Sequence, residues 1–95
     1  MNIVERVRQM ERHLDDVLDA FYIRKVSLKD CPEIQEKITL LENYYDSGEW
    51  LKDYDRDARG ELPEGMKRGV LAQDTLYNLF SDIREQFTQE PSSES

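Results

Sequence analysis

The chain reads YYDSGEWLKDYDRDARGELPEGMKRGVL from Tyr44 to Leu71, and this stretch separates segments that have a plain helical pattern. It holds all four glycines, the only tryptophan and three of the five tyrosines. A connection of this length is uncommon inside a small domain unless it packs against the rest or has a function. We therefore interpret the part at about 49–72 as an ordered, irregular segment that wraps over the neighbouring helices.

Three main helices are predicted around this segment, at about 2–26, 31–47 and 73–88, because hydrophobic residues recur there at intervals of three and four. Gly48 is expected to stop the second helix, since glycine readily adopts the left-handed conformation. The stripes consist of Ile3, Val7, Met10, Leu14, Val17 and Phe21, then Ile34, Ile38, Leu41 and Tyr45, then Leu76, Leu79, Phe80, Ile83 and Phe87. The predicted fold is all-α, with a single helical domain at 1–88 and a disordered tail at 89–95.

Trp50, Leu51 and Tyr54 stand at i, i+1 and i+4, so a short helical turn there would press them onto the core. Two of these residues belong to an aromatic group that has two interpretations. Its members are Tyr44, Tyr45, Trp50, Tyr54 and Tyr77. Aromatic side chains close small hydrophobic cores, and they also dominate protein interfaces. We favour the core and keep the interface as the alternative.

Composition excludes several classes of function. A chain of 95 residues forms one domain, and its net charge of −8 repels nucleic acid and anionic membranes. The single cysteine, Cys31, permits neither an internal disulfide nor a zinc site built on cysteines. The N-terminus meets charge within a few residues, which argues against a signal peptide, and no run approaches the roughly 18 apolar residues of a membrane span. We therefore expect a cytoplasmic protein.

The middle of the chain also carries a resemblance. The runs YYDSGEWLKDY (44–54), GELP (60–63) and KRGVL (67–71), with Asp74 close behind, resemble a family of small bacterial proteins called domain of unknown function 4298. The resemblance is specific over about 44–80, whereas upstream it rests on helical pattern alone. It implies a short bacterial protein and supplies no activity.

Acidic residues in the same stretch have the spacing of a calcium-binding EF-hand loop. Positions 1, 3, 5, 7, 9 and 12 of that loop would be Asp53, Asp55, Asp57, Arg59, Glu61 and Glu64. However, position 6 requires glycine and is Ala58, and Pro63 precedes the residue that would bind the ion through both oxygens. We therefore expect a solvated acidic turn and no cofactor, and we keep Asp53, Asp55, Asp57 and Glu64 as the only candidate metal ligands.

Lys67 and Arg68 form a small basic island in this acidic chain. Arginine can clamp phosphate or carboxylate groups, but pairing with the nearby acidic residues is the interpretation that we favour. The only histidine, His13, and the only cysteine, Cys31, have no partner that would indicate a nucleophile and its base. We therefore do not expect an enzyme.

These observations favour a non-enzymatic, bacterial, cytoplasmic protein-interaction module. The candidate interaction surface consists of Trp50, Asp53, Tyr54, Lys67 and Arg68. Its partner would be a protein and not nucleic acid or a membrane, and a homodimer stays open because so small a core gains from association. The alternative is a regulator that binds a small ligand or a metal through residues 53–69.

Overall fold

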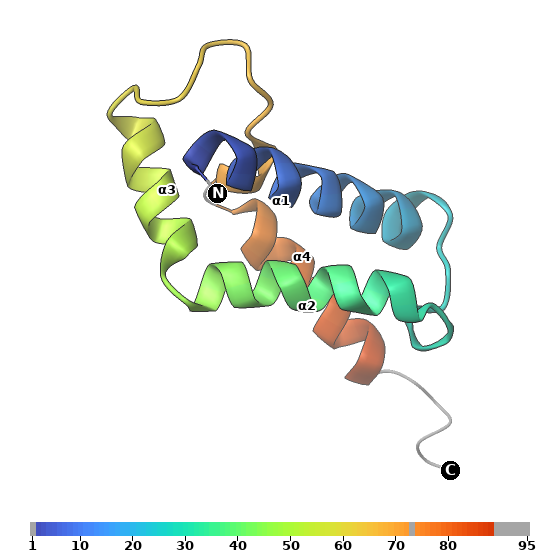
Figure 1. Ribbon diagram of the computed structural model, residues 1–95. Coiled ribbons are helices and arrows are strands. Elements are labelled where there is room, and N and C mark those ends of the chain that lie inside the picture. Colours follow the sequence, from blue (N-terminus) through green and yellow to red (C-terminus); the bar gives the residue numbers. More distant parts are fainter. Residues whose placement is uncertain (1, 73, 89–95) are drawn as a thin grey trace.

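The computed structural model of the protein describes residues 2–72 and 74–88. This part of the chain is all-α, as predicted, and contains no strand (Figure 1). The predicted disordered tail at 89–95 lies outside the described residues, and so does residue 73, at which the third predicted helix was expected to begin.

Two antiparallel helices, α1 (Ile3–Leu18) and α2 (Pro32–Asp46), pack along each other and form the base of the fold (Figure 1). Their predicted apolar stripes face inward. The buried members of these stripes are Val7, Leu14 and Val17 from α1, and Ile34, Ile38 and Leu41 from α2, and Tyr44 is buried beside them. Tyr44 therefore takes the core position that the pattern assigned to Tyr45, which is only partly buried.

The first helix ends earlier than predicted. After α1 the chain widens into a π-helical turn, η1 (Asp19–Ile23), and Lys25 then has a φ of 54°, in the left-handed region. This conformation stops the helix, because a non-glycine residue cannot repeat it along the chain. The N–H group of Val26 donates back to the carbonyl of Ala20 at 2.9 Å. A single turn of 3₁₀-helix, η2 (Leu28–Asp30), then buries Leu28 and leads into α2.

The described residues form four α-helices, one more than the three main helices that the sequence predicts. A fourth, α3 (Glu49–Ala58), occupies ten residues of the segment that was expected to be irregular. Gly48, with a φ of 94°, separates it from α2 and so stops α2 as predicted. Two of the four residues on the buried side of α3, Asp53 and Asp57, are acidic, and this composition hid the helical pattern.

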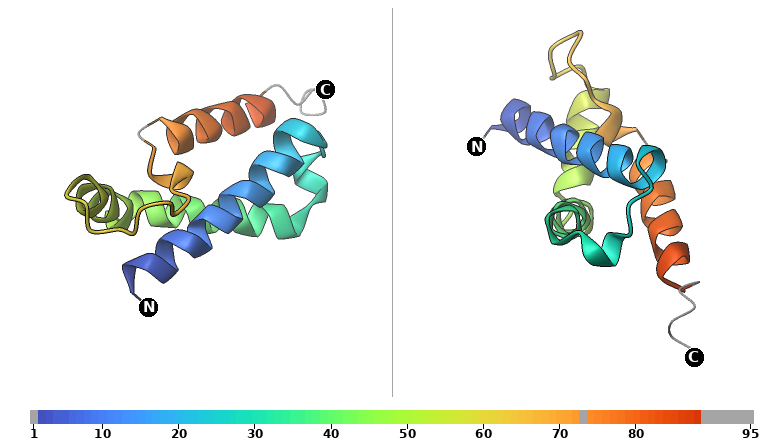
Figure 2. Two further views of the ribbon diagram at one scale, coloured as in Figure 1. Left: turned by 90° about the horizontal axis from the view of Figure 1, so that it is seen from above. Right: turned by 90° about the vertical axis from the view of Figure 1, so that its right-hand side faces the viewer.

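The chain from 59 to 68 has no helical structure and passes over α1, as the yellow loop in Figure 1 shows. A second 3₁₀ turn, η3 (Gly69–Leu71), brings Val70 and Leu71 into the core, and Leu62 anchors the middle of the loop. The last helix, α4 (Thr75–Thr88), crosses the α1–α2 pair on the side away from the first turn of α1 (Figure 2). The expectation of an ordered wrap therefore holds for this shorter loop.

None of the helices within the described residues combines the length and the apolar character that crossing a membrane requires.

Candidate functional site

The central segment is held to the rest of the fold at two polar junctions. The first is the carboxylate of Asp53, which projects from α3 and is 0% exposed. Its Oδ2 accepts from Arg6 Nε at 2.9 Å and from the Tyr44 hydroxyl at 2.7 Å, while Oδ1 accepts from Arg6 Nη2 at 2.7 Å. One buried charge thus ties α1, α2 and α3 together, and its bidentate ion pair compensates the loss of hydration.

The pKa shifts of Arg6 and Tyr44 are consistent with their hydrogen bonds to Asp53. The pKa of Arg6 is raised, first of all by its hydrogen bond to Asp53. The pKa of Tyr44 is raised as well, mainly because the phenol is buried and further because it donates to Asp53. Both side chains are therefore protonated donors at neutral pH, and both serve the same carboxylate.

The second junction surrounds the backbone of Val70. Glu11, only 6% exposed, accepts from the Val70 N–H group through Oε1 at 2.8 Å, and Trp50 Nε1 donates to the Val70 carbonyl at 2.8 Å. At the neighbouring Gly69, a Cβ atom would lie 3.2 Å from Glu11 Oε2, closer than most Cβ contacts. The returning loop is therefore fixed between α1 and α3 by side chains of both helices.

The basic island of the loop is engaged in contacts within the protein. Lys67 Nζ lies 2.7 Å from Asp15 Oδ2 and 3.9 Å from Glu11 Oε2, both on α1. Arg68 pairs with Asp57 on α3 and donates to the carbonyl of Pro63. These contacts agree with the ion pairing that the sequence favoured over an anion clamp at Lys67 and Arg68.

The five residues of the predicted interaction surface do lie around this region, but they do not form a surface. Trp50 is 8% exposed and Asp53 is fully buried, so neither can contact a partner. Tyr54 is partly buried and stacks on Trp50, with ring centroids 5.1 Å apart. Lys67 and Arg68 reach the surface with their charges already paired. These five residues therefore mainly form contacts inside the protein that hold the central segment to the helices.

The aromatic group divides in the same way. Tyr44 and Trp50 belong to the buried core, and Tyr45 and Tyr54 pack against it. Tyr77, which is 64% exposed, is the member that points outward. The core interpretation therefore holds for every member of the group except Tyr77.

The acidic residues with EF-hand spacing do not converge. The first of these residues lie on helix α3, which ends at Ala58, and a helix directs them to different sides. Asp53 points into the protein, whereas Asp55 lies on the outside, 3.5 Å from Arg59. Asp57 is held by Arg68, and Glu64 is exposed in the loop. Among the described residues no three His, Cys, Asp or Glu side chains come together in a way that suits a metal ion.

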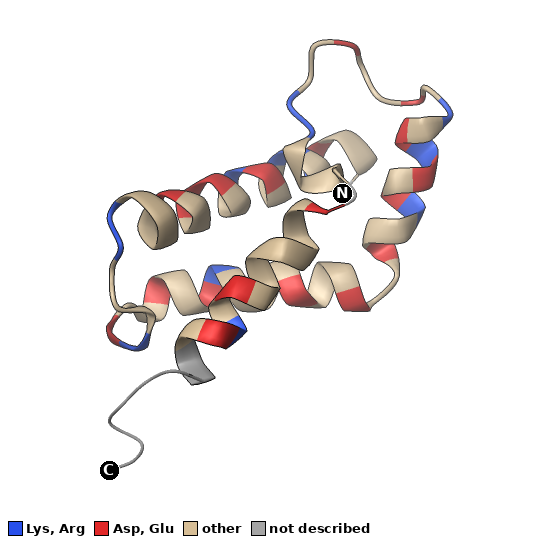
Figure 3. Ribbon diagram, turned by 180° about the vertical axis from the view of Figure 1, so that it is seen from behind, with Lys and Arg blue, Asp and Glu red and all other residues tan. Residues whose placement is uncertain are grey.

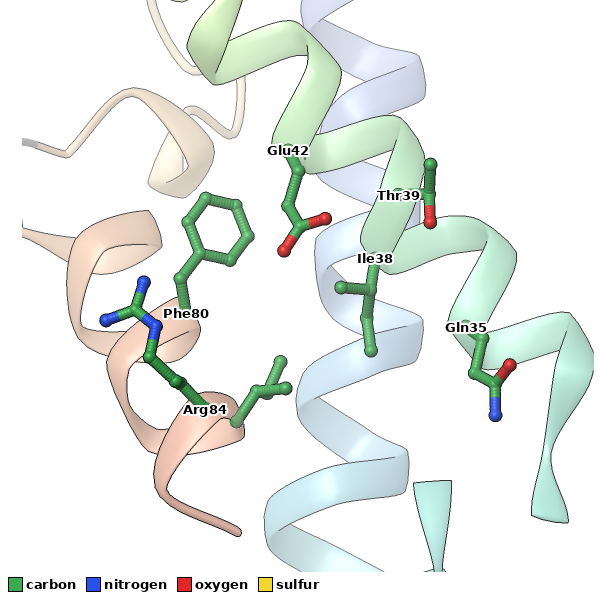
Figure 4. A pocket seen from close by; sticks show the side chains of 7 residues that line it. Gln35, Ile38, Thr39, Glu42, Phe80 and Arg84 are labelled. Carbon is green, nitrogen blue, oxygen red and sulfur yellow. The ribbon is translucent and has the colours of Figure 1, made fainter. Parts of the chain in front are cut away.

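An open groove that the sequence did not indicate runs between α2 and α4. Its larger hollow, of about 580 Å³, is shown in Figure 4, where Ile38 and Phe80 lie between the polar side chains of Gln35, Glu42 and Arg84. A second hollow, of about 310 Å³, shares Glu42, Phe80 and Arg84 with the first and continues toward Tyr45, Asp46 and Tyr77. The groove therefore has an apolar floor and a charged rim.

Two anchors connect α4 to other parts of the fold. The Tyr22 hydroxyl, from η1, donates to the Asp82 carboxylate on α4. Burial and this hydrogen bond raise the pKa of Tyr22 to about 12, so the donor stays protonated at neutral pH. At the other end, α4 comes shortly after the buried η3 turn. These two anchors connect α4 to η1 and to the buried η3 turn.

His13 carries the one buried side-chain polar atom that lacks a hydrogen-bond partner among the described residues, its Nε2. Burial of the ring lowers the pKa of His13, the charge of Lys37 lowers it further, and Asp16 opposes this effect. Arg12 and Glu36 add weaker effects of opposite sign. The folded protein therefore holds His13 neutral at a pH where an exposed histidine would begin to gain a proton.

This shift predicts a pH dependence of stability. Below about pH 6.5 the unfolded chain binds a proton at His13 more readily than the folded chain does. The free energy of unfolding therefore decreases as the pH is lowered. His13→Gln removes this contribution, and we expect the variant to gain stability relative to the wild type on going from about pH 8 to about pH 5. Urea denaturation of both proteins at the two pH values measures the effect. A difference in stability that does not change with pH would contradict it.

Comparison with known proteins gives a match to a family model. The model described as domain of unknown function (DUF4298) matches residues 7–90. No curated protein and no solved structure matches the chain.

Proposed function

This chain belongs to the family described as domain of unknown function (DUF4298), and we propose that it is a non-enzymatic protein-interaction module of the bacterial cytoplasm. The observation that carries the proposal is the groove between α2 and α4, with its apolar floor and charged rim. Binding is favoured over catalysis by the placement of the buried ionisable groups. Glu11, Tyr44 and Asp53 all serve the two junctions that hold the fold together.

The groove suits one kind of occupant, a cationic amphipathic helix of another protein. A groove between two helices accepts the apolar side of a third helix, with anchors at intervals of three and four residues. Ile38 and Phe80 offer the apolar contact. At the charged rim, the carboxylates of Glu42 and Asp46 outnumber the guanidinium of Arg84. The net charge of −8 favours the approach of a cationic segment and slows that of an acidic one.

A selection of displayed helical peptides tests this proposal. The library carries Lys and Arg beside the apolar stripe in one half and Asp and Glu there in the other half. We expect binders to come from the cationic half, and we expect their amide shift changes in the labelled protein to map to α2 and α4. Selection of acidic peptides, or a footprint elsewhere on the protein, would overturn the proposal.

A charge reversal at the rim sharpens the test. Glu42→Arg places a positive charge where the cationic peptide binds, and we expect its Kd to rise about tenfold, which corresponds to about 1.4 kcal/mol. Glu36→Arg makes the same change at another exposed position of α2 that does not line the groove. Fluorescence anisotropy with one selected peptide compares the two variants, and equal Kd values for them would exclude the groove as the binding site.

A further inference from the structure

A separate hollow of about 330 Å³ lies between α1 and the loop that passes over it. Arg8, Glu11, Arg12 and Asp15 line it from α1, and Gly65, Met66 and Lys67 line it from the loop. Figure 3 shows the basic end of the loop descending beside α1, which carries basic bands of its own. This hollow shares no residue with the α2–α4 groove, so a ligand bound in it is independent of the proposed function.

Arg8 and Arg12 differ from Arg6 on the same helix, from Arg24 after η1 and from the arginines of the central segment. Neither guanidinium makes an ion pair or a hydrogen bond with any residue that the structure describes. By contrast, carboxylates pair with Arg6, Arg24, Arg56, Arg59 and Arg68. Arg8 and Arg12 also stand at i and i+4, where like charges on a helix repel each other. Although the chain has 21 acidic and only 13 basic residues, these two arginines lie side by side without a carboxylate partner in the part of the chain that the structure describes. This arrangement lowers the stability of the ligand-free protein.

The acidic residues of the hollow make no ion pair with these arginines. Glu11 is directed at the Val70 N–H group, and Asp15 is paired with Lys67 at 2.7 Å. The guanidinium groups of Arg8 and Arg12 thus keep their donors and their positive charges for a ligand. Two arginine forks present several N–H donors, and with Lys67 the basic side chains of the hollow outnumber its two carboxylates.

We propose that this hollow binds a phosphoryl group, held by Arg8 and Arg12 with Lys67 at its edge. A phosphoryl group carries a charge of about −1.5 to −2 and three strong acceptor oxygens, which match two guanidinium groups better than a single carboxylate does. Binding would relieve the repulsion between the two arginines, because the anion would sit between them. The phosphoryl group can be free or attached to a side chain, since the chemistry is the same.

Titration of the whole chain at low ionic strength tests the proposal, with inorganic phosphate, pyrophosphate, O-phosphoserine and acetate as probes. We expect amide shift changes at residues 8–15 and 65–67 with the phosphoryl compounds. Pyrophosphate binding more tightly than O-phosphoserine points to a free ligand, whereas the reverse order points to a modified side chain, and either order supports the site. Acetate binding as tightly as phosphate, or no shift change with any phosphoryl compound, would overturn the proposal.

The double variant Arg8→Gln, Arg12→Gln provides the decisive comparison. We expect its Kd for the best probe to rise at least about tenfold, while its Tm without ligand stays the same or rises because the like charges are gone. The matched control is Lys25→Gln, Lys52→Gln, which removes two exposed positive charges away from the hollow. Equal loss of affinity in both double variants would show a general effect of net charge and would also overturn the site.

Discussion

Asp53→Ala is expected to lower the free energy of unfolding by about 3–5 kcal/mol, the usual result of removing one partner from a buried ion pair. The loss is large because two groups lose their acceptor at once. The Arg6 guanidinium, with only 19% of its side chain exposed, and the buried Tyr44 hydroxyl both donate to this carboxylate. A loss of this size is a large share of the roughly 5–15 kcal/mol that stabilises a typical domain.

Urea denaturation followed by circular dichroism measures this effect. Asp55→Ala is the matched control, because Asp55 lies on the exposed side of the same helix and faces Arg59 at 3.5 Å. An exposed pair of that kind contributes at most about 1 kcal/mol. Asp53→Asn should fall between the two, since an amide retains one acceptor oxygen. Equal stabilities of the Asp53→Ala and Asp55→Ala variants would show that the junction does not stabilise the fold.

The burial of Asp53 could not be predicted from the sequence, whereas much of the helical framework could. The helices α1 and α2 were predictable because their buried positions carry aliphatic side chains with helical spacing, as at Val7, Leu14 and Leu41. In α3 the buried positions include Asp53, and an acidic residue in a polar stretch indicates a solvated turn. The partner that makes its burial possible, Arg6, lies 47 residues away in sequence, so no local pattern connects the two.

Of the candidate sites, one could also be predicted from the sequence and one could not. Pairing of Lys67 and Arg68 could be predicted, because a chain with a surplus of acidic residues offers many carboxylates to a basic pair. The groove could not, because it depends on how far α4 stands from α2. The contacts around α4 include the Tyr22–Asp82 hydrogen bond and the burial of Val70 just before it, and neither is visible in the sequence around Glu42 or Phe80.

The second large effect is expected at Trp50. Trp50→Ala should cost about 3–5 kcal/mol, because it leaves a cavity beneath α3 and removes the donor to the Val70 carbonyl. The indole also packs against the rings of Tyr45 and Tyr54, with centroids 5.1 Å apart in each case. Leu51→Ala, at a neighbouring position of α3 that is 61% exposed, should change stability by less than about 0.5 kcal/mol and serves as the control.

Trp50→Phe separates the two contributions. Phenylalanine keeps most of the packing but cannot donate, so the Val70 carbonyl loses its side-chain donor at a cost of about 1–3 kcal/mol. Because Val70 is where the loop returns to the core, this variant should also loosen the chain from 59 to 68. Trypsin, which cleaves after Arg and Lys, should then cut at Arg59 or Lys67 faster than in the wild type. A Trp50→Phe protein that is destabilised but cut no faster would mean that Glu11 alone holds the loop, through its bond to the Val70 N–H group.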